Sequence, residues 1–184
     1  MKLDSLKALL VHELNDLHDA ERQLVKVLPK MAKAASSEDL RLALERHLDQ
    51  AREHVRKLER AFSLLSEKPR RTTCKAMRGI LEEAEEMIRA TGDPAIKDAG
   101  LISAAQRVEH YEMAGYGCAR SYAEMLDEED SAALLQQTLD DERATDESFT
   151  ELAERLIHPE PIHALRFAAA DLSSSRRKNG SRIA

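Results

Sequence analysis

Acidic and imidazole side chains interrupt the apolar stripes of four long segments of this chain. In each segment the apolar residues step by threes and fours, the spacing that keeps side chains on one face of a helix. The interrupting residues are Glu21 in the first segment, His47 and His54 in the second, Glu109 and Glu112 in the third, and Glu142 and Asp146 in the fourth. Burying an unpaired carboxylate is costly, so these side chains need partners. A bundle that turned the four stripes toward one another would gather them into a metal site.

The depths of these residues can be compared if neighbouring segments form antiparallel hairpins. Residues at equal depth in a hairpin have numbers that add up to twice the number at its turn, and the first turn falls near residue 36. Glu21 then lies level with Ala51, and Gln50 and His54 bracket that level. Because a helix rises about 1.5 Å per residue, the three polar side chains lie within a few ångströms of one another along the axis.

In the second hairpin, too, the polar side chains lie at similar depth. With its turn near residue 128, Glu112 lies level with residue 144, between Glu142 and Asp146, and Glu109 lies about one turn away. Carboxylates, an amide and an imidazole form a donor set that suits iron or manganese. The sequence therefore predicts a di-iron or di-manganese centre whose candidate ligands are Glu21, Gln50, His54, Glu109, Glu112, Glu142 and Asp146.

A simpler interpretation of the same residues stays open. Glu142 stands in a charged run, residues 140–143, that fits a solvated helix face, and His47 and His54 fit core histidines with satisfied hydrogen bonds. The coincidence of depth across four segments favours the metal site over this interpretation.

Five helices would have to position these residues. The apolar spacing and the capping residues predict helices over residues 5–34, 38–66, 74–90, 94–125 and 131–157. Thr73 is the expected cap of the short third helix, and Gly92 and Pro94 separate it from the fourth. We expect an all-α, four-helix bundle with a short helix between two hairpins. This domain spans residues 1–158, and the polar, basic extension at 159–184 is expected to be weakly structured or disordered.

Composition limits the other classes of function. Aromatic residues make up only 3% of the 184 residues, a low share for a β-sandwich or barrel. The net charge of −6 disfavours nucleic acid as a partner, although Arg70 and Arg71 and the run at 176–178 are basic. No apolar run approaches the roughly 20 residues of a membrane span. The two cysteines, Cys74 and Cys118, are interpreted as small core residues, and a cytoplasmic protein is expected.

The segment 94–125 carries a second apolar stripe, which predicts burial on two sides. Its members are Leu101, Val108, Tyr111, Gly115, Cys118, Tyr122 and Met125. This face could meet the short helix or the same helix of a second copy, and Gly115 and Gly117 would permit a close approach. We expect a homodimer through this region.

Five segments of the chain, taken in order, resemble the YciE/YciF family of bacterial stress proteins. They are residues 13–24, 47–54, 73–83, 104–117 and 138–146, of which 104–117 is the most specific. The resemblance covers about residues 5–157. It implies a ferritin-like bundle with an added helix, a homodimer and a di-metal centre, but it gives the fold more firmly than the activity.

Two departures from the expected ligand pattern bear on function. Position 50 is Gln where relatives often have Glu, and residues 142–146 contain no histidine where ferritin-like sites use Glu-x-x-His. Weaker or asymmetric metal loading is therefore expected. Two functions remain open: a metal-binding stress protein with weak iron or peroxide oxidation, and a metal-free helical dimer that acts as a structural or interaction module.

Overall fold

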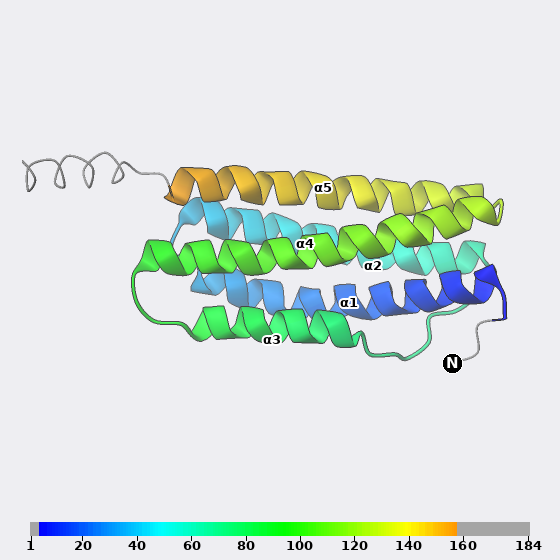
Figure 1. Cartoon of the computed structure of the whole chain (residues 1–184), viewed down its shortest axis with the longest axis horizontal. Helices are drawn as coiled ribbons and strands as arrows, with labels where there is room; N and C mark the ends of the chain where they lie inside the picture. The colour runs from blue at the N-terminus through cyan, green and yellow to red at the C-terminus, as the bar shows by residue number, and fades with distance from the viewer. Residues whose placement is uncertain (1–3, 158–184) are drawn as a thin grey trace, which may run out of the picture.

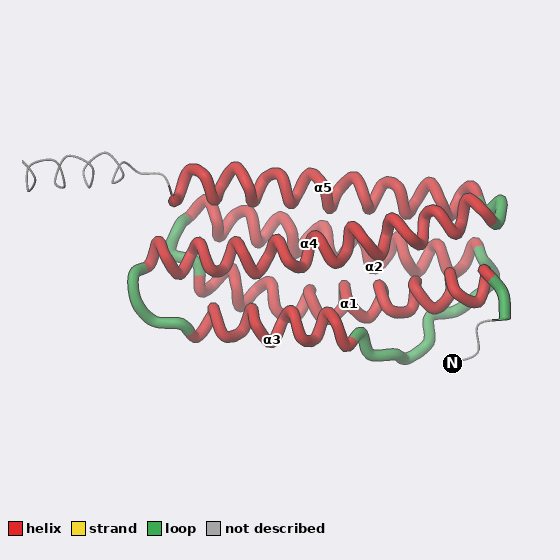
Figure 2. The backbone as a smooth tube through the Cα atoms, in the orientation of Figure 1, coloured by secondary structure: helices red, strands yellow, loops and turns green. Residues whose placement is uncertain are grey.

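The computed structural model describes residues 4–157, which form five helices and no strand (Figures 1 and 2). The helices are α1 (Leu6–Ala34), α2 (Glu38–Leu64), α3 (Lys75–Arg89), α4 (Pro94–Met125) and α5 (Glu129–Ile157). None of these five is both long and apolar enough to cross a membrane. The C-terminal extension expected at 159–184 lies outside the described residues.

The four long helices form a bundle in which each packs against two others. α1 contacts α2 and α4, and α5 contacts α2 and α4, so the four helices enclose a common axis (Figure 1). α3 packs outside the bundle, along α1 and α4, and carries the chain from the end of α2 to the start of α4. This is the all-α bundle with a short helix between two hairpins that the sequence predicts.

Polar caps explain where the helices begin. Ser5 and Ser37 accept hydrogen bonds from the backbone N–H groups of the first turns of α1 and α2, and Asp93 does so for α4. The expected cap of α3 was wrong by one residue, because the Cys74 thiol and not Thr73 accepts from the Met77 N–H. α5 also begins two residues earlier than expected, at Glu129.

A buried aspartate fixes the register between the two hairpins. Asp98, in the first turns of α4, is 2% exposed, and its two carboxylate oxygens accept the N–H groups of Ser36 and Ser37 at 2.8 and 2.7 Å. Charge-assisted hydrogen bonds of this kind are stronger than neutral ones. They bind the start of α4 to the turn between α1 and α2, so the depths of residues on the two hairpins are set relative to each other.

Two apolar clusters fill the bundle, one toward each end. The first lies beside α3 and includes Leu28, Leu44, Met77 and Leu101, and the second includes Leu14, Phe62, Tyr116 and Leu135. On each long helix, the members of the two clusters are separated by a short stretch that contains a buried polar residue. The bundle is thus apolar at both ends and polar in between.

The second face of α4 is largely covered within the chain. Leu101 and Val108 are buried, and a methyl carbon of Leu17 on α1 packs against Gly115. Cys118 is exposed, so its assignment as a core residue was wrong. Met125, at the end of α4, is also exposed.

Alanine substitutions at two glycines of α4 should have opposite effects on stability. A Cβ at Gly115 would lie 2.7 Å from the Leu17 methyl, whereas a Cβ at Gly117 would have no atom within 4 Å. We expect Gly115→Ala to lower the free energy of unfolding by about 0.5–2 kcal/mol, because the cost of overpacking against Leu17 exceeds the gain in helix propensity. Gly117→Ala should raise it by about 0.5–1 kcal/mol, because alanine favours the helix. Urea denaturation of both variants checks this, and a stable Gly115→Ala protein would contradict the packing.

Candidate metal centre

Six ionisable side chains from the four long helices meet between the two apolar clusters. They are Glu21 from α1, His47 and His54 from α2, Glu109 and Glu112 from α4, and Glu142 from α5. Each is at most 1% exposed. The six form two groups that share Glu142, and within each group the potential ligand atoms lie within 4.8 Å of one another. One group holds His47, Glu109, Glu112 and Glu142, and the other holds Glu21, His54 and Glu142.

The carboxylates at this centre have few hydrogen-bond donors. Both oxygens of Glu109, Glu112 and Glu142 are buried, and no group among the described residues donates a hydrogen bond to them. The imidazole nitrogens are close but poorly aligned: His54 Nδ1 lies 3.0 Å from a Glu142 oxygen, and His47 Nδ1 lies 3.1 Å from a Glu109 oxygen. Buried carboxylates without donors are costly, so the centre requires protons or cations.

Burial raises the pKa of three of the four glutamates. It raises the pKa of Glu21 to about 7, with the nearby Glu142 charge acting in the same direction. Burial, followed by the charges of neighbouring glutamates, raises the pKa of Glu109 and of Glu112 well above the ordinary value. Without a cation, these carboxyls therefore hold protons more tightly than an exposed glutamate does.

The two histidines respond to burial in opposite ways. Burial lowers the pKa of His47 to about 4, so this ring is neutral near pH 7 and its nitrogens can bind a metal. Burial alone would lower the pKa of His54 as well, but Glu142 and Glu21 beside the ring raise it to about 10. Burial opposes ionisation of Glu142, yet His54 outweighs it and lowers the pKa of that carboxyl. The metal-free centre therefore contains one charged pair, His54 and Glu142.

Neighbouring side chains orient the potential ligands. The buried Tyr116 hydroxyl donates a hydrogen bond of 2.7 Å to Glu21. On the outer side of His54, Nε2 lies 3.3 Å from the Asp141 carboxylate, which also accepts a hydrogen bond of 2.7 Å from Lys57. A carboxylate behind a histidine fixes the orientation of the ring, as is common around metal-binding histidines.

Two of the expected ligands lie beside the centre and belong to neither group. Gln50 is half-buried, and its side-chain oxygen lies 3.3 Å from the hydroxyl of Thr145. Asp146 faces α4, where it lies 3.3 Å from both Gln106 and His110. The other five expected residues, Glu21, His54, Glu109, Glu112 and Glu142, all belong to the two groups.

His47 belongs to the first group, although sequence reasoning favoured a core role for it. It precedes His54 by seven residues, two turns of the same helix face, and this spacing was the available signal. The Phe149 ring packs against it with a centroid distance of 6.0 Å. Phe149, Gln50 and Thr145 also line an outer hollow of about 480 Å³ between α2 and α5, so they form the wall between solvent and the centre on this side.

Comparison with known proteins shows which family the chain matches. The family model for a domain of unknown function, DUF892, matches residues 5–160. Protein YciF of Escherichia coli K12 is 40% identical over 154 residues, which cover 83% of this chain and 93% of the relative. The crystal structure of the Escherichia coli stress protein YciF superposes with a TM-score of 0.82 at 38% identity, covering 84% of this chain and 98% of that one. YcfI from Rhodopseudomonas palustris superposes with a TM-score of 0.78 at 34% identity, covering 82% and 97%.

Proposed function

The chain belongs to the DUF892 family, and we propose that it is a ferritin-like stress protein that binds two iron or manganese ions in its bundle core. The observation that carries this proposal is the convergence of four buried glutamates and two buried histidines, arranged as two groups around Glu142. Glu142 would bridge the two ions. His47, Glu109 and Glu112 would complete one set of ligands, and Glu21 and His54 would complete the other.

The charges of these residues fit two divalent cations. When ionised, the four glutamates carry four negative charges, which two divalent ions would balance if both histidines are neutral. Oxygen-rich ligand sets with one imidazole for each ion suit iron or manganese better than zinc. His47 supplies the second imidazole that α5 lacks, so a histidine on α2 would take the place of the missing Glu-x-x-His partner. Gln50 and Asp146, predicted as ligands from the sequence, would act outside the ligand shell.

Bound iron or manganese would supply one-electron chemistry with oxygen or peroxide, from which we propose a weak oxidation of Fe²⁺ with oxygen or peroxide as the oxidant. The residues around the centre would hold its ligands in place. Tyr116 orients Glu21 through its hydroxyl, and Asp141 holds the outer nitrogen of His54. Phe149 and the contact between Gln50 and Thr145 would restrict water at the seam of α2 and α5.

Metal counting tests this proposal directly. We expect protein purified without added metal, then titrated with Mn²⁺ at neutral pH, to bind about two ions per chain, one for each ligand group. The double variant Glu112→Gln, Glu142→Gln should lose both, because it removes one ligand of the first group and the shared carboxylate. Elemental analysis after gel filtration gives the stoichiometry.

The exposed Glu147 on α5 provides a matched control. Glu147→Gln removes one carboxylate from the same helix and should leave the stoichiometry unchanged. A folded wild-type protein that bound neither iron nor manganese at neutral pH would contradict the proposal.

A metal-free structural or interaction module is the second candidate function. One observation favours it: protons on Glu21, Glu109 and Glu112, with the pair of His54 and Glu142, would leave the centre electrically neutral without metal. The relative YcfI is itself proposed to be a structural protein. We also propose that the chain forms a homodimer through α4. The exposed Cys118 and Met125 on this helix support the proposal, because they leave part of its second apolar face uncovered within the chain. The absence of metal together with a dimeric mass in light scattering would favour this second function.

A further inference from the structure

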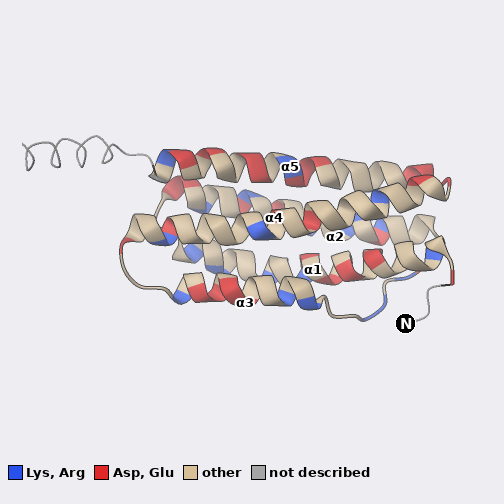
Figure 3. Cartoon of the chain, viewed as in Figure 1, with Lys and Arg blue, Asp and Glu red and all other residues tan. Residues whose placement is uncertain are grey.

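A basic groove runs along α1 from its cap Ser5 to Lys26, and none of the residues that line it is a candidate ligand of the metal centre. The loop between α2 and α3 forms its other wall, and the basic stretch of that loop is coloured blue in Figure 3. The groove consists of two adjoining hollows of about 540 and 480 Å³, which share Arg70, Arg71 and Thr72. The combined size exceeds what a single small anion needs and is in the range of pockets for small organic ligands.

Side chains of α1 hold the backbone of this loop in place. The buried Asn15 accepts a hydrogen bond of 2.5 Å from the Arg70 N–H. Asp19 accepts the Cys74 N–H at 2.8 Å, and Gln23 donates to the Cys74 carbonyl at 3.1 Å. Because the backbone is tied at both points, a ligand that bound the arginine side chains would not have to order the loop, which lowers the entropy cost of binding.

The groove is positively charged although the chain as a whole is acidic. Five cationic residues line the two hollows, Lys7, Arg22, Lys26, Arg70 and Arg71, against two acidic ones, Asp19 and Glu67. The lining therefore has a formal net charge of +3, whereas the whole chain has −6.

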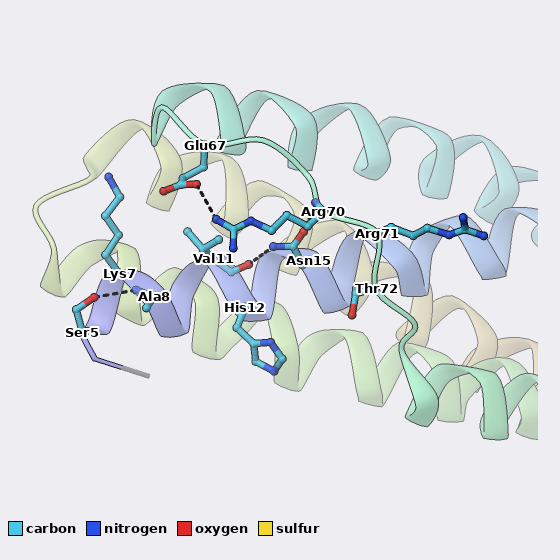
Figure 4. Close-up of a pocket in the computed structure, with 10 residues that line it drawn as sticks. All are labelled: Ser5, Lys7, Ala8, Val11, His12, Asn15, Glu67, Arg70, Arg71 and Thr72. Atoms are coloured by element: carbon cyan, nitrogen blue, oxygen red, sulfur yellow. Dashed lines mark hydrogen bonds and ion pairs between the residues drawn. The ribbon is translucent and has the colours of Figure 1, made fainter. Parts of the chain in front are cut away.

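Several of these cations have free charges. The side chains of Arg22, Lys26 and Arg71 are exposed, and none of them forms an ion pair or a hydrogen bond with any described residue. Arg70 has only a loose ion pair, with Glu67 at 3.7 Å. Exposed pairs of this kind are weak, so Arg70 remains available to a ligand. Figure 4 shows the Arg70 and Arg71 side chains running in opposite directions along α1, so their charges are spread along the groove.

The lining points to a phosphoryl chain and not to single-stranded nucleic acid. Guanidinium groups bind phosphate through paired hydrogen bonds, and the hydroxyls of Thr72 and Thr73 add uncharged donors. No Phe, Tyr or Trp lines either hollow, so the groove lacks the stacking surfaces on which single-stranded nucleic acids bind. We propose that this groove binds a linear chain of phosphoryl groups, such as that of inorganic tripolyphosphate or a nucleoside triphosphate.

Calorimetric titration of the full chain with tripolyphosphate tests the proposal. At about 50 mM salt, we expect saturable binding that the double variant Arg70→Gln, Arg71→Gln weakens about tenfold or more, since two charge-assisted contacts are lost. Both side chains are exposed, so the variant should keep its fold. Tripolyphosphate can also remove metal from the protein. This effect would be equal in the wild type and the variant, so it cancels when their binding is compared.

A charge-matched variant separates a site from a general effect of net charge. Arg52→Gln, Arg143→Gln removes two exposed arginines of α2 and α5, outside the groove, and should change the affinity by less than about twofold. An equal loss in this control, or no binding to the wild type at millimolar tripolyphosphate, would overturn the proposal.

A parallel titration with adenosine triphosphate distinguishes the two sources of phosphoryl groups. Equal affinity indicates that the phosphoryl chain alone is recognised, and tighter binding indicates a nucleotide; either result supports the proposal. Tighter binding of duplex DNA that tripolyphosphate does not displace would overturn it.

Discussion

Replacing Glu112 with methionine is expected to raise the melting temperature of the metal-free protein and to remove most of the stabilisation that manganese gives. Glu112 is fully buried, and neither of its oxygens receives a hydrogen bond from a described residue. Methionine has a similar length and no polar atom to desolvate. The substitution therefore removes an unsatisfied acid from the core and, on the proposed function, a ligand of the first ion.

The expected effects are large enough to measure separately. Leaving a buried polar group without a hydrogen-bond partner costs about 1–3 kcal/mol, and an apolar residue of similar volume avoids this cost. In a protein of this size, each kcal/mol shifts the melting temperature by about 2–4 °C. For the wild type, free Mn²⁺ at a hundred times its dissociation constant would add about 2.7 kcal/mol for each site. Calorimetry in chelator and in Mn²⁺ measures both quantities.

The surface variant Glu147→Gln serves as the control for this experiment. It should have the wild-type melting temperature in chelator and the wild-type response to Mn²⁺. If Glu112→Met lowered the melting temperature in chelator while the manganese response stayed intact, Glu112 would be a structural residue and not a ligand.

The sequence predicted the fold and the depth of the centre because both depend on periodicity. Apolar spacing assigned the helices. The turn positions placed His54 within one turn of the level of Glu21, and Glu142 within one turn of the level of Glu112, and in the structure each of these pairs shares a group. The depths within each hairpin needed only the helical rise and the position of one turn. The depth of one hairpin relative to the other depends on Asp98, which ties the two together at one end and which the turn positions do not predict.

The outer part of the centre could not be predicted in this way, because it depends on rotation about each helix. Asp146 follows Glu142 by four residues, an angular offset of roughly 40°, and on α5 this offset turns Asp146 toward Gln106 of α4. Thr145 points the other way, toward Gln50. His47 was underestimated for a different reason: a buried histidine in a helix is usually a core residue, and only its closeness to Glu109 and Glu142 indicates a ligand.

The metal-free protein is expected to lose stability as the pH rises from 6.5 to 8. Folding raises the pKa of Glu21 to about 7, that of His54 to about 10, and those of Glu109 and Glu112 well above normal. A group with a raised pKa in the folded state stabilises below its unfolded pKa, and this contribution is lost as the pH rises through the folded value. All four groups therefore act in the same direction within this window.

The groups with lowered pKa values oppose this effect only weakly above pH 6.5. The pKa of Glu142 is lowered, so its contribution is complete in this window and is lost only on acidification. The pKa of His47 falls from 6.5 to about 4, so its contribution grows by less than about 0.5 kcal/mol between pH 6.5 and 8. Each group that binds a proton only in the folded state changes the stability by about 1.4 kcal/mol per pH unit. We expect Glu21 and His54 together to cost about 2 kcal/mol over this window, with Glu109 and Glu112 adding to the loss in the same direction, measured by urea denaturation in chelator.

Two comparisons identify the centre as the origin of this pH dependence. Glu112→Met lacks one of the four groups, so its stability should fall less steeply with pH than that of the wild type. Manganese-loaded wild type should show a flatter profile, because bound ions replace the protons and bind more tightly as the ligands ionise. A metal-free protein whose stability rose between pH 6.5 and 8 would mean that its buried glutamates are ionised and compensated without metal.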